Sequence, residues 1–136
     1  MPFDIRGVID RPAADILVQR PARRMHFLQG ATSLWLGPTN ERPVAVFVVH
    51  YADGRQHEFP IVFGEDVRDW DADTDPTETV SRGKIAWRGR NAADHDIRLF
   101  LSTWENPFPG QEVGSVDYVS AAPNCAPFLI AATVEP

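Results

Sequence analysis

Apolar and polar residues alternate most clearly on either side of Asp53-Gly54, within the stretch from Val44 to Trp70. Alternation with a period of two is typical of a β-strand that buries one face. Asp-Gly tolerates the positive φ angles of a two-residue type I′ turn, so the pattern predicts a hairpin that turns at this pair. Such a turn would place His50 opposite His57 and would decide which side chains face the core. The predicted core face comprises Val44, Val46, Val48, Phe59, Ile61 and Phe63.

The opposite face of the predicted hairpin carries Phe47, Val49 and Tyr51 beside polar residues. An exposed apolar patch commonly marks a protein contact. A homo-oligomer formed through this outer hairpin face is therefore one hypothesis, and a protein-interaction or assembly module is an alternative function.

Seven other short apolar stretches, bounded by Pro, Gly and polar residues, have the length and composition of strands. They are residues 3–9, 15–19, 23–34, 84–90, 97–104, 112–120 and 126–134. In the stretch 84–90, Trp87 is expected to point into the core. About nine strands without a long helix predict an all-β protein. We expect a β-sandwich or barrel, with an antiparallel jelly-roll sandwich favoured, forming a single domain over residues 1–136.

Composition limits the compartment and the partners. The chain has 136 residues and one cysteine, Cys125, which excludes an internal disulfide and a multi-cysteine metal site. The net charge of −6 argues against nucleic-acid binding, and no polybasic or long apolar segment indicates a membrane. The N-terminal residues lack the features of a signal peptide. The protein is thus expected to be cytoplasmic if Met1 is its native start, and extracytoplasmic if it is a module excised from a longer chain.

Six phrases along the chain resemble a known family. They are FDIRGVI at 3–9, RRMHFLQGA at 23–31, VVHYADG at 48–54, IVFGEDVRDW at 61–70, IRLFLSTWENP at 97–107 and VDYVSAAPNCAPFLIAATVE at 116–135. Together they resemble a galactose-binding-like β-sandwich module found near the C-terminus of large bacterial proteins of the planctomycete and verrucomicrobial type. This family is similar to the carbohydrate-binding modules of glycoside hydrolases. The resemblance implies a β-sandwich with a non-catalytic binding role, and it supplies no ligand residues.

Three tryptophans, Trp35, Trp70 and Trp104, lie where predicted strands meet loops. Indole rings stack on the apolar faces of sugars, and nearby polar groups can bind the hydroxyls, so we predict a carbohydrate site at a rim of the sandwich. The polar residues assigned to it adjoin Trp70 and Trp104 in sequence: Arg68, Asp69, Glu105 and Asn106. The alternative is that these tryptophans cap the ends of the core.

Two other groups of residues are candidate metal ligands. The loop from Asp69 to Glu78 spaces its carboxylates as calcium-binding loops do, although the helix-loop-helix signature is absent. Its candidate ligands for a structural calcium ion are Asp69, Asp71, Asp73 and Asp75; a solvated acidic loop is the alternative. His50 and His57, if they face each other, are candidates for a transition metal.

The function favoured by the sequence is a non-catalytic module that binds carbohydrate. A small jelly-roll metalloenzyme that uses His50 and His57 is a further alternative to it. The chain contains no Gly-x-Ser-x-Gly nucleophile motif and no Gly-rich phosphate-binding loop.

Overall fold

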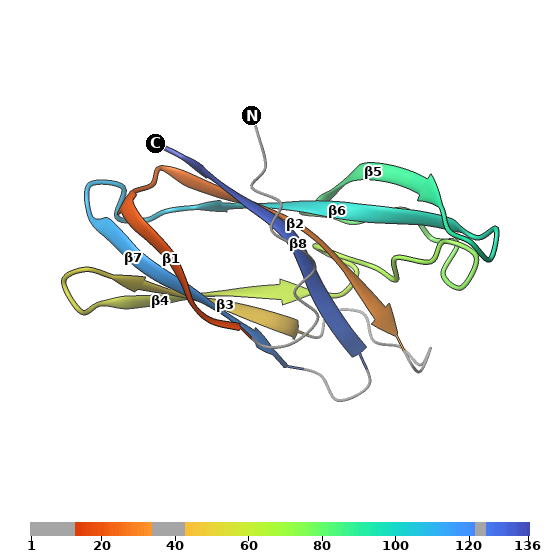
Figure 1. Cartoon of the computed structure of the whole chain (residues 1–136), viewed down its shortest axis with the longest axis horizontal. Coiled ribbons are helices and arrows are strands. Elements are labelled where there is room, and N and C mark those ends of the chain that lie inside the picture. Colours follow the sequence, from red (N-terminus) through yellow and green to blue (C-terminus); the bar gives the residue numbers. More distant parts are fainter. Residues whose placement is uncertain (1–12, 34–42, 122–124) are drawn as a thin grey trace.

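The chain folds into two antiparallel β-sheets packed face to face, as Figure 1 shows. The computed structural model describes residues 13–33, 43–121 and 125–136. The described strands are β1 (Ala13–Pro21), β2 (Arg24–Ser33), β3 (Pro43–Tyr51), β4 (Gln56–Val62), β5 (Lys84–Arg90), β6 (Asp96–Glu105), β7 (Glu112–Ser120) and β8 (Cys125–Glu135). Within these ranges, no helix is long and apolar enough to cross a membrane.

Each sheet has four described strands, in the order β1-β7-β3-β4 in one and β5-β6-β2-β8 in the other. The hairpins β3–β4 and β5–β6 each stay within one sheet, and the chain changes sheets at its other described connections. The prediction of an all-β sandwich is thus confirmed, with eight strands described where about nine were expected. The predicted strand at 3–9 lies outside the described residues.

The central hairpin turns at Asp53-Gly54, but its register differs by one residue from the prediction. Tyr51 N donates to Arg55 O (2.8 Å) and Gly54 N donates to Tyr51 O (3.0 Å), so the loop has one residue more than expected. Gly54 has a φ of 93°, the left-handed conformation that completes a loop of this kind. His50 and His57 consequently pair with different residues, and the prediction that they face each other is wrong.

This one-residue shift exchanges the two faces of β3. Phe47, Val49 and Tyr51 point into the core. Phe47 stacks on Phe27 of β2 in the opposite sheet, with ring centroids 3.8 Å apart. The predicted outer hairpin face is therefore core, and the surface suggested there for a homo-oligomer is not available.

The predicted core face of the hairpin is correct for β4 and only partly correct for β3. Phe59, Ile61 and Phe63 are buried as expected, and so is Val44 at the start of β3. Val46 and Val48 are only partly buried because the shifted register turns them away from the opposite sheet.

A bulge in β5 reverses a second expectation. Ile85 pairs with Phe100 and Trp87 pairs with Leu99, which leaves Ala86 as an extra residue on β5. Trp87 therefore points outward and is 46% exposed, although the sequence predicts it to be core.

Candidate functional site

The connection between β4 and β5, residues 63–83, contains no strand or helix of its own. Connections of this length are uncommon in compact domains and are usually either functional or disordered. Its segment at Trp70 lies between the two central strands of one sheet. Trp70 N donates to Ala31 O of β2 (2.8 Å), and Trp70 O accepts from Arg98 N of β6 (2.9 Å). These backbone hydrogen bonds to β2 and β6 thus anchor the loop at one end of the sandwich.

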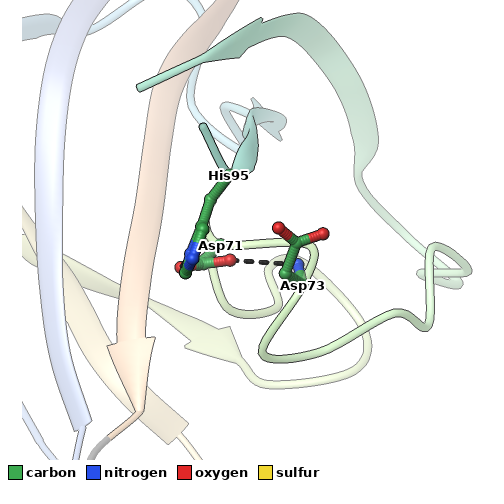
Figure 2. Close-up of side chains that lie close together, drawn as sticks. All are labelled: Asp71, Asp73 and His95. Carbon is green, nitrogen blue, oxygen red and sulfur yellow. Dashed lines mark hydrogen bonds and ion pairs between the residues drawn. The ribbon is translucent and has the colours of Figure 1, made fainter. Parts of the chain in front are cut away.

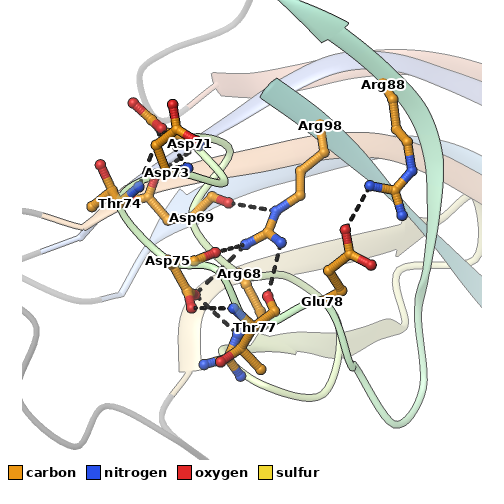
Figure 3. A network of polar contacts seen from close by, with 10 residues as sticks. All are labelled: Arg68, Asp69, Asp71, Asp73, Thr74, Asp75, Thr77, Glu78, Arg88 and Arg98. Atoms are coloured by element: carbon orange, nitrogen blue, oxygen red, sulfur yellow. Dashed lines mark hydrogen bonds and ion pairs between the residues drawn. The ribbon is translucent and has the colours of Figure 1, made fainter. Parts of the chain in front are cut away.

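Arg98 holds this loop from inside the protein (Figure 3). Its side chain has 0% exposure, and its guanidinium donates to three backbone carbonyls: Asp69 (3.0 Å), Asp75 (2.7 Å) and Thr77 (2.8 Å). Burial lowers the pKa of Arg98, and the charge of Asp75 opposes that shift. Because three carbonyls of one loop converge on one rigid guanidinium, the loop is held to a defined path.

Arginines also pair with two buried carboxylates at the base of this loop. Asp66, which is fully buried, accepts from Arg82 Nε (2.7 Å) and from the backbone N of Val62 (2.8 Å). Asp75 Oδ2 accepts from Arg68 Nε (2.9 Å). These carboxylates support the loop and are not available to a ligand.

Asp71, Asp73 and His95 form a separate cluster near the surface (Figure 2). His95 lies in the turn between β5 and β6, and its Nδ1 is 2.7 Å from Asp71 Oδ2. One potential ligand atom from each of the three residues lies within 4.8 Å of the others. The hydrogen bond from His95 lowers the pKa of Asp71, and the same contact raises the pKa of His95.

The four carboxylates predicted as calcium ligands do not converge. Asp75 pairs with Arg68, and Asp69 is 3% exposed and accepts from the backbone N of Asp71 (2.9 Å). Only Asp71 and Asp73 lie together, and they lie with His95. His95 could not be recognised from the sequence, because it is 24 residues from Asp71 and no local pattern marks it.

The two tryptophans of the predicted sugar site lie near opposite ends of one sheet. Trp70 pairs with Arg98 near the start of β6, whereas Trp104 lies near the end of that strand, roughly 20 Å away at ~3.3 Å per residue. Trp104 is 4% exposed, and its ring lies 5.9 Å from that of His57. Trp104 thus caps the core, as the alternative interpretation holds. Trp35 lies outside the described residues.

The polar residues assigned to the sugar site have structural partners instead. Asn106 is buried, accepts from the Tyr51 hydroxyl (2.6 Å) and donates to the carbonyl of Ala22 (2.7 Å). Glu105 accepts from Arg24 Nε (2.6 Å). Together with the contacts of Arg68 and Asp69 described above, these bonds show that the predicted rim site is not assembled.

The outer face of the β5-β6-β2-β8 sheet presents aromatic rings instead. A Cβ on Gly30 would lie 2.6 Å from the ring of Phe128, which therefore covers this glycine. Trp70 meets Phe128 edge to face, with centroids 5.9 Å apart. A Cβ on Gly89 would lie 2.5 Å from the ring of Trp87. In both places a glycine leaves room for an aromatic ring to lie on the sheet.

His50 and His57 do not form a metal pair. His50 Nε2 lies 2.8 Å from Asp117 Oδ2 on the neighbouring strand β7, while His57 lies beside Trp104. His57 pairs with Val49, the residue next to His50 on β3. Consecutive residues of a strand point to opposite faces of a sheet, so the His50 and His57 rings lie on opposite faces of this one. His50 and His57 therefore cannot bind one metal ion together, as the metalloenzyme hypothesis requires.

A second polar cluster joins the ends of β2, β6 and β8. His26 Nδ1 lies 2.9 Å from Thr103 Oγ1, and His26 Nε2 lies 3.0 Å from Glu135 Oε2. Arg24 NH1 donates to the other oxygen of Glu135 (3.2 Å). Hydroxyl, imidazole and carboxylate follow one another as in a nucleophilic triad. Here, however, His26–Thr103 and Arg24–Glu135 are directly opposite pairs on adjacent strands, which is typical of pairs that stabilise a sheet.

These features define the class of protein: an antiparallel β-sandwich with a long, internally braced loop at one end. Comparison with protein-family models, with curated proteins and with solved structures found no match. The resemblance to a galactose-binding-like module therefore stays a prediction, and the fold class rests on the structure.

Proposed function

We propose that the chain is a non-catalytic β-sandwich module that binds carbohydrate on the outer face of the β5-β6-β2-β8 sheet. The observation that carries this proposal is Trp87, which is 46% exposed on β5. Tryptophan is largely buried in most folded proteins, and a contiguous exposed apolar patch commonly marks a binding site. Trp87 contributes to such a patch, because the partly buried Leu99 and Leu101 lie on the same outer face. A flat ring of this kind offers the apolar platform on which the face of a sugar stacks.

The position of Trp87 suits such a platform. Its ring lies over Gly89, so the strand supports it from below. A ring that is already held in place loses little conformational entropy when a ligand binds. Lys84 pairs with Leu101 on the same outer side, and its ammonium group can bind sugar hydroxyls.

A glycan array followed by titration calorimetry tests this function. We expect the chain to bind at least one polysaccharide, and Trp87→Ala to weaken that binding by about tenfold or more, the ~1.4 kcal/mol or more typical of a central aromatic contact. Phe108→Ala is the matched control, because Phe108 is also exposed (38%) but follows the opposite end of β6. If no glycan binds, or if the two variants bind equally well, the proposal is wrong.

A protein contact on the same face is the second candidate. Leu99 and Leu101 of β6 and Leu28 of β2 form a partly buried apolar row beside Trp87. An apolar row next to an exposed aromatic ring is typical of a protein interface. Light scattering over a range of concentrations would detect self-association, and Trp87→Arg should abolish it. A strict monomer would exclude a second copy of the chain as the partner.

A further inference from the structure

The cluster of Asp71, Asp73 and His95 is held from two separate parts of the chain. His95 belongs to the β5–β6 turn, where Asn91 N donates to His95 O (3.1 Å) and His95 N donates to Asn91 Oδ1 (3.0 Å). Asp71 belongs to the loop that Arg98 holds from inside. The imidazole and the carboxylate therefore meet because both of their backbones are fixed.

The backbone also orients the Asp71 carboxylate. Oδ1 accepts from the amides of Asp73 (3.0 Å) and Thr74 (3.2 Å), which leaves Oδ2 directed at His95 Nδ1. Hydrogen bonds to one oxygen of a carboxylate are the usual way in which proteins aim the other oxygen at a metal. Asp73 is exposed, and none of the bonds within the described residues uses its carboxylate, so this side chain is able to turn toward the same point.

We infer that Asp71, Asp73 and His95 form a binding site for one divalent transition-metal ion of the Zn²⁺ type. Imidazole nitrogen and carboxylate oxygen bind such an ion at about 2.0–2.2 Å, which sets ligand atoms about 3–4 Å apart. The three ligand atoms lie within 4.8 Å of one another, so a rotation of the exposed Asp73 side chain and a slight separation of the Asp71–His95 pair, now at 2.7 Å, would bring them into that range. The ion would replace the proton of the hydrogen bond between His95 Nδ1 and Asp71 Oδ2. Calcium is disfavoured because it needs six to eight oxygens.

Metal binding would join the loop 63–83 to the β5–β6 turn. The ion binds the folded protein and not the unfolded chain, so it should raise the melting temperature in proportion to its occupancy. This inference does not rest on carbohydrate binding, because the cluster uses none of the residues proposed for the sugar.

Calorimetric titration of the full chain, prepared without a histidine tag, with ZnCl₂ and separately with CaCl₂ tests the site. We expect one Zn²⁺ per chain, a higher melting temperature with Zn²⁺, and weaker or no binding of Ca²⁺. His95→Gln and Asp73→Asn should each weaken Zn²⁺ binding by at least about tenfold, as the loss of a metal contact does. Both side chains lie near the surface, so both variants should fold.

Two matched control variants test whether Zn²⁺ binds at this cluster or is merely attracted by other carboxylates and imidazoles of the protein. Asp94→Asn removes a neighbouring carboxylate that is 83% exposed, and His50→Gln removes an imidazole on another strand. Both should bind Zn²⁺ like the parent chain. A parent chain that binds no Zn²⁺ would overturn the inference, and so would equal affinity in His95→Gln, Asp73→Asn and the controls. Tighter binding of Ca²⁺ than of Zn²⁺ would also overturn it.

Discussion

At the scale of single residues, Arg98 shows how one buried charge can organise a loop. Its side chain lies in an apolar strand, and each of its three donor positions has a backbone carbonyl as acceptor. A buried guanidinium is stable only when its hydrogen bonds are satisfied. The carbonyls of Asp69 and Asp75 are buried with the guanidinium and would lose this donor in its absence, so each side stabilises the other.

Arg98→Lys should lower the free energy of unfolding by about 2–4 kcal/mol. An ammonium group is a point charge on a flexible stem and cannot reach the three carbonyls as the planar guanidinium does. Urea denaturation measures the change. Arg90→Lys is the control, since Arg90 is 61% exposed and its ion pairs with Asp94 and Asp96 lie at the surface, where pairs contribute at most about 1 kcal/mol. Equal midpoints for the two variants would contradict the role given to Arg98.

At the scale of elements, the register of the β3–β4 hairpin decides what the protein buries. The sequence locates the turn at Asp53-Gly54 correctly, but one extra loop residue exchanges the faces of β3. The choice is energetic: the shifted register places Phe47 and Tyr51 between the sheets, where they bury more apolar area than the smaller Val46 and Val48 would. The bulge at Ala86 of β5 has the same kind of effect on Trp87.

Gly54→Ala should destabilise the protein by about 1–2 kcal/mol, because Gly54 has a φ of 93° and a Cβ is disfavoured there. Gly110→Ala is the control: a Cβ at that position meets nothing within 4 Å. Its effect should stay within about 0.5 kcal/mol. Chemical denaturation of both variants gives the comparison, and a Gly54 variant as stable as the Gly110 variant would argue against the left-handed turn.

At the scale of the whole molecule, polar contacts at the C-terminal end of β8 connect the strands of one sheet. Glu135 of β8 contacts His26 and also pairs with Arg23 and Arg24, at the start of β2. The hydrogen bond with His26 is the main cause that lowers the pKa of Glu135, and the charges of the two arginines add to it. The ionised carboxylate of Glu135 therefore stabilises the end of the sheet at which β2 begins and β8 ends.

The lowered pKa of Glu135 predicts how stability depends on pH. A carboxylate with a lowered folded-state pKa contributes stability above its ordinary pKa of about 4.5, and this is lost as the pH falls through the folded value. Glu135→Gln should therefore destabilise the chain at pH 7, and the difference from the parent chain should shrink below about pH 4.5. Urea midpoints between pH 3 and 7 report it, with Glu58→Gln, at an exposed carboxylate on β4, as the control. A difference that does not change with pH would exclude this linkage.

The sequence by itself determined the fold class and the position of most elements. β7 was predicted at 112–120 and lies at Glu112–Ser120, and β2 was predicted at 23–34 and lies at Arg24–Ser33. The acidic stretch 69–78 was predicted to be a loop, and it is one. These features follow from local alternation, turn residues and composition, which are present in any short window of the chain.

Only the tertiary structure decided the register, the faces and the polar partners. A single inserted residue in a turn or a bulge reverses every side chain after it, and packing against the other sheet selects between the two outcomes. Packing therefore put Phe47 inside and Trp87 outside. The contacts of Arg98 with the loop join residues that are 21 to 29 positions apart. The contact of His95 with Asp71 joins residues that are 24 positions apart. Such contacts depend on where distant backbones meet, which no local pattern encodes.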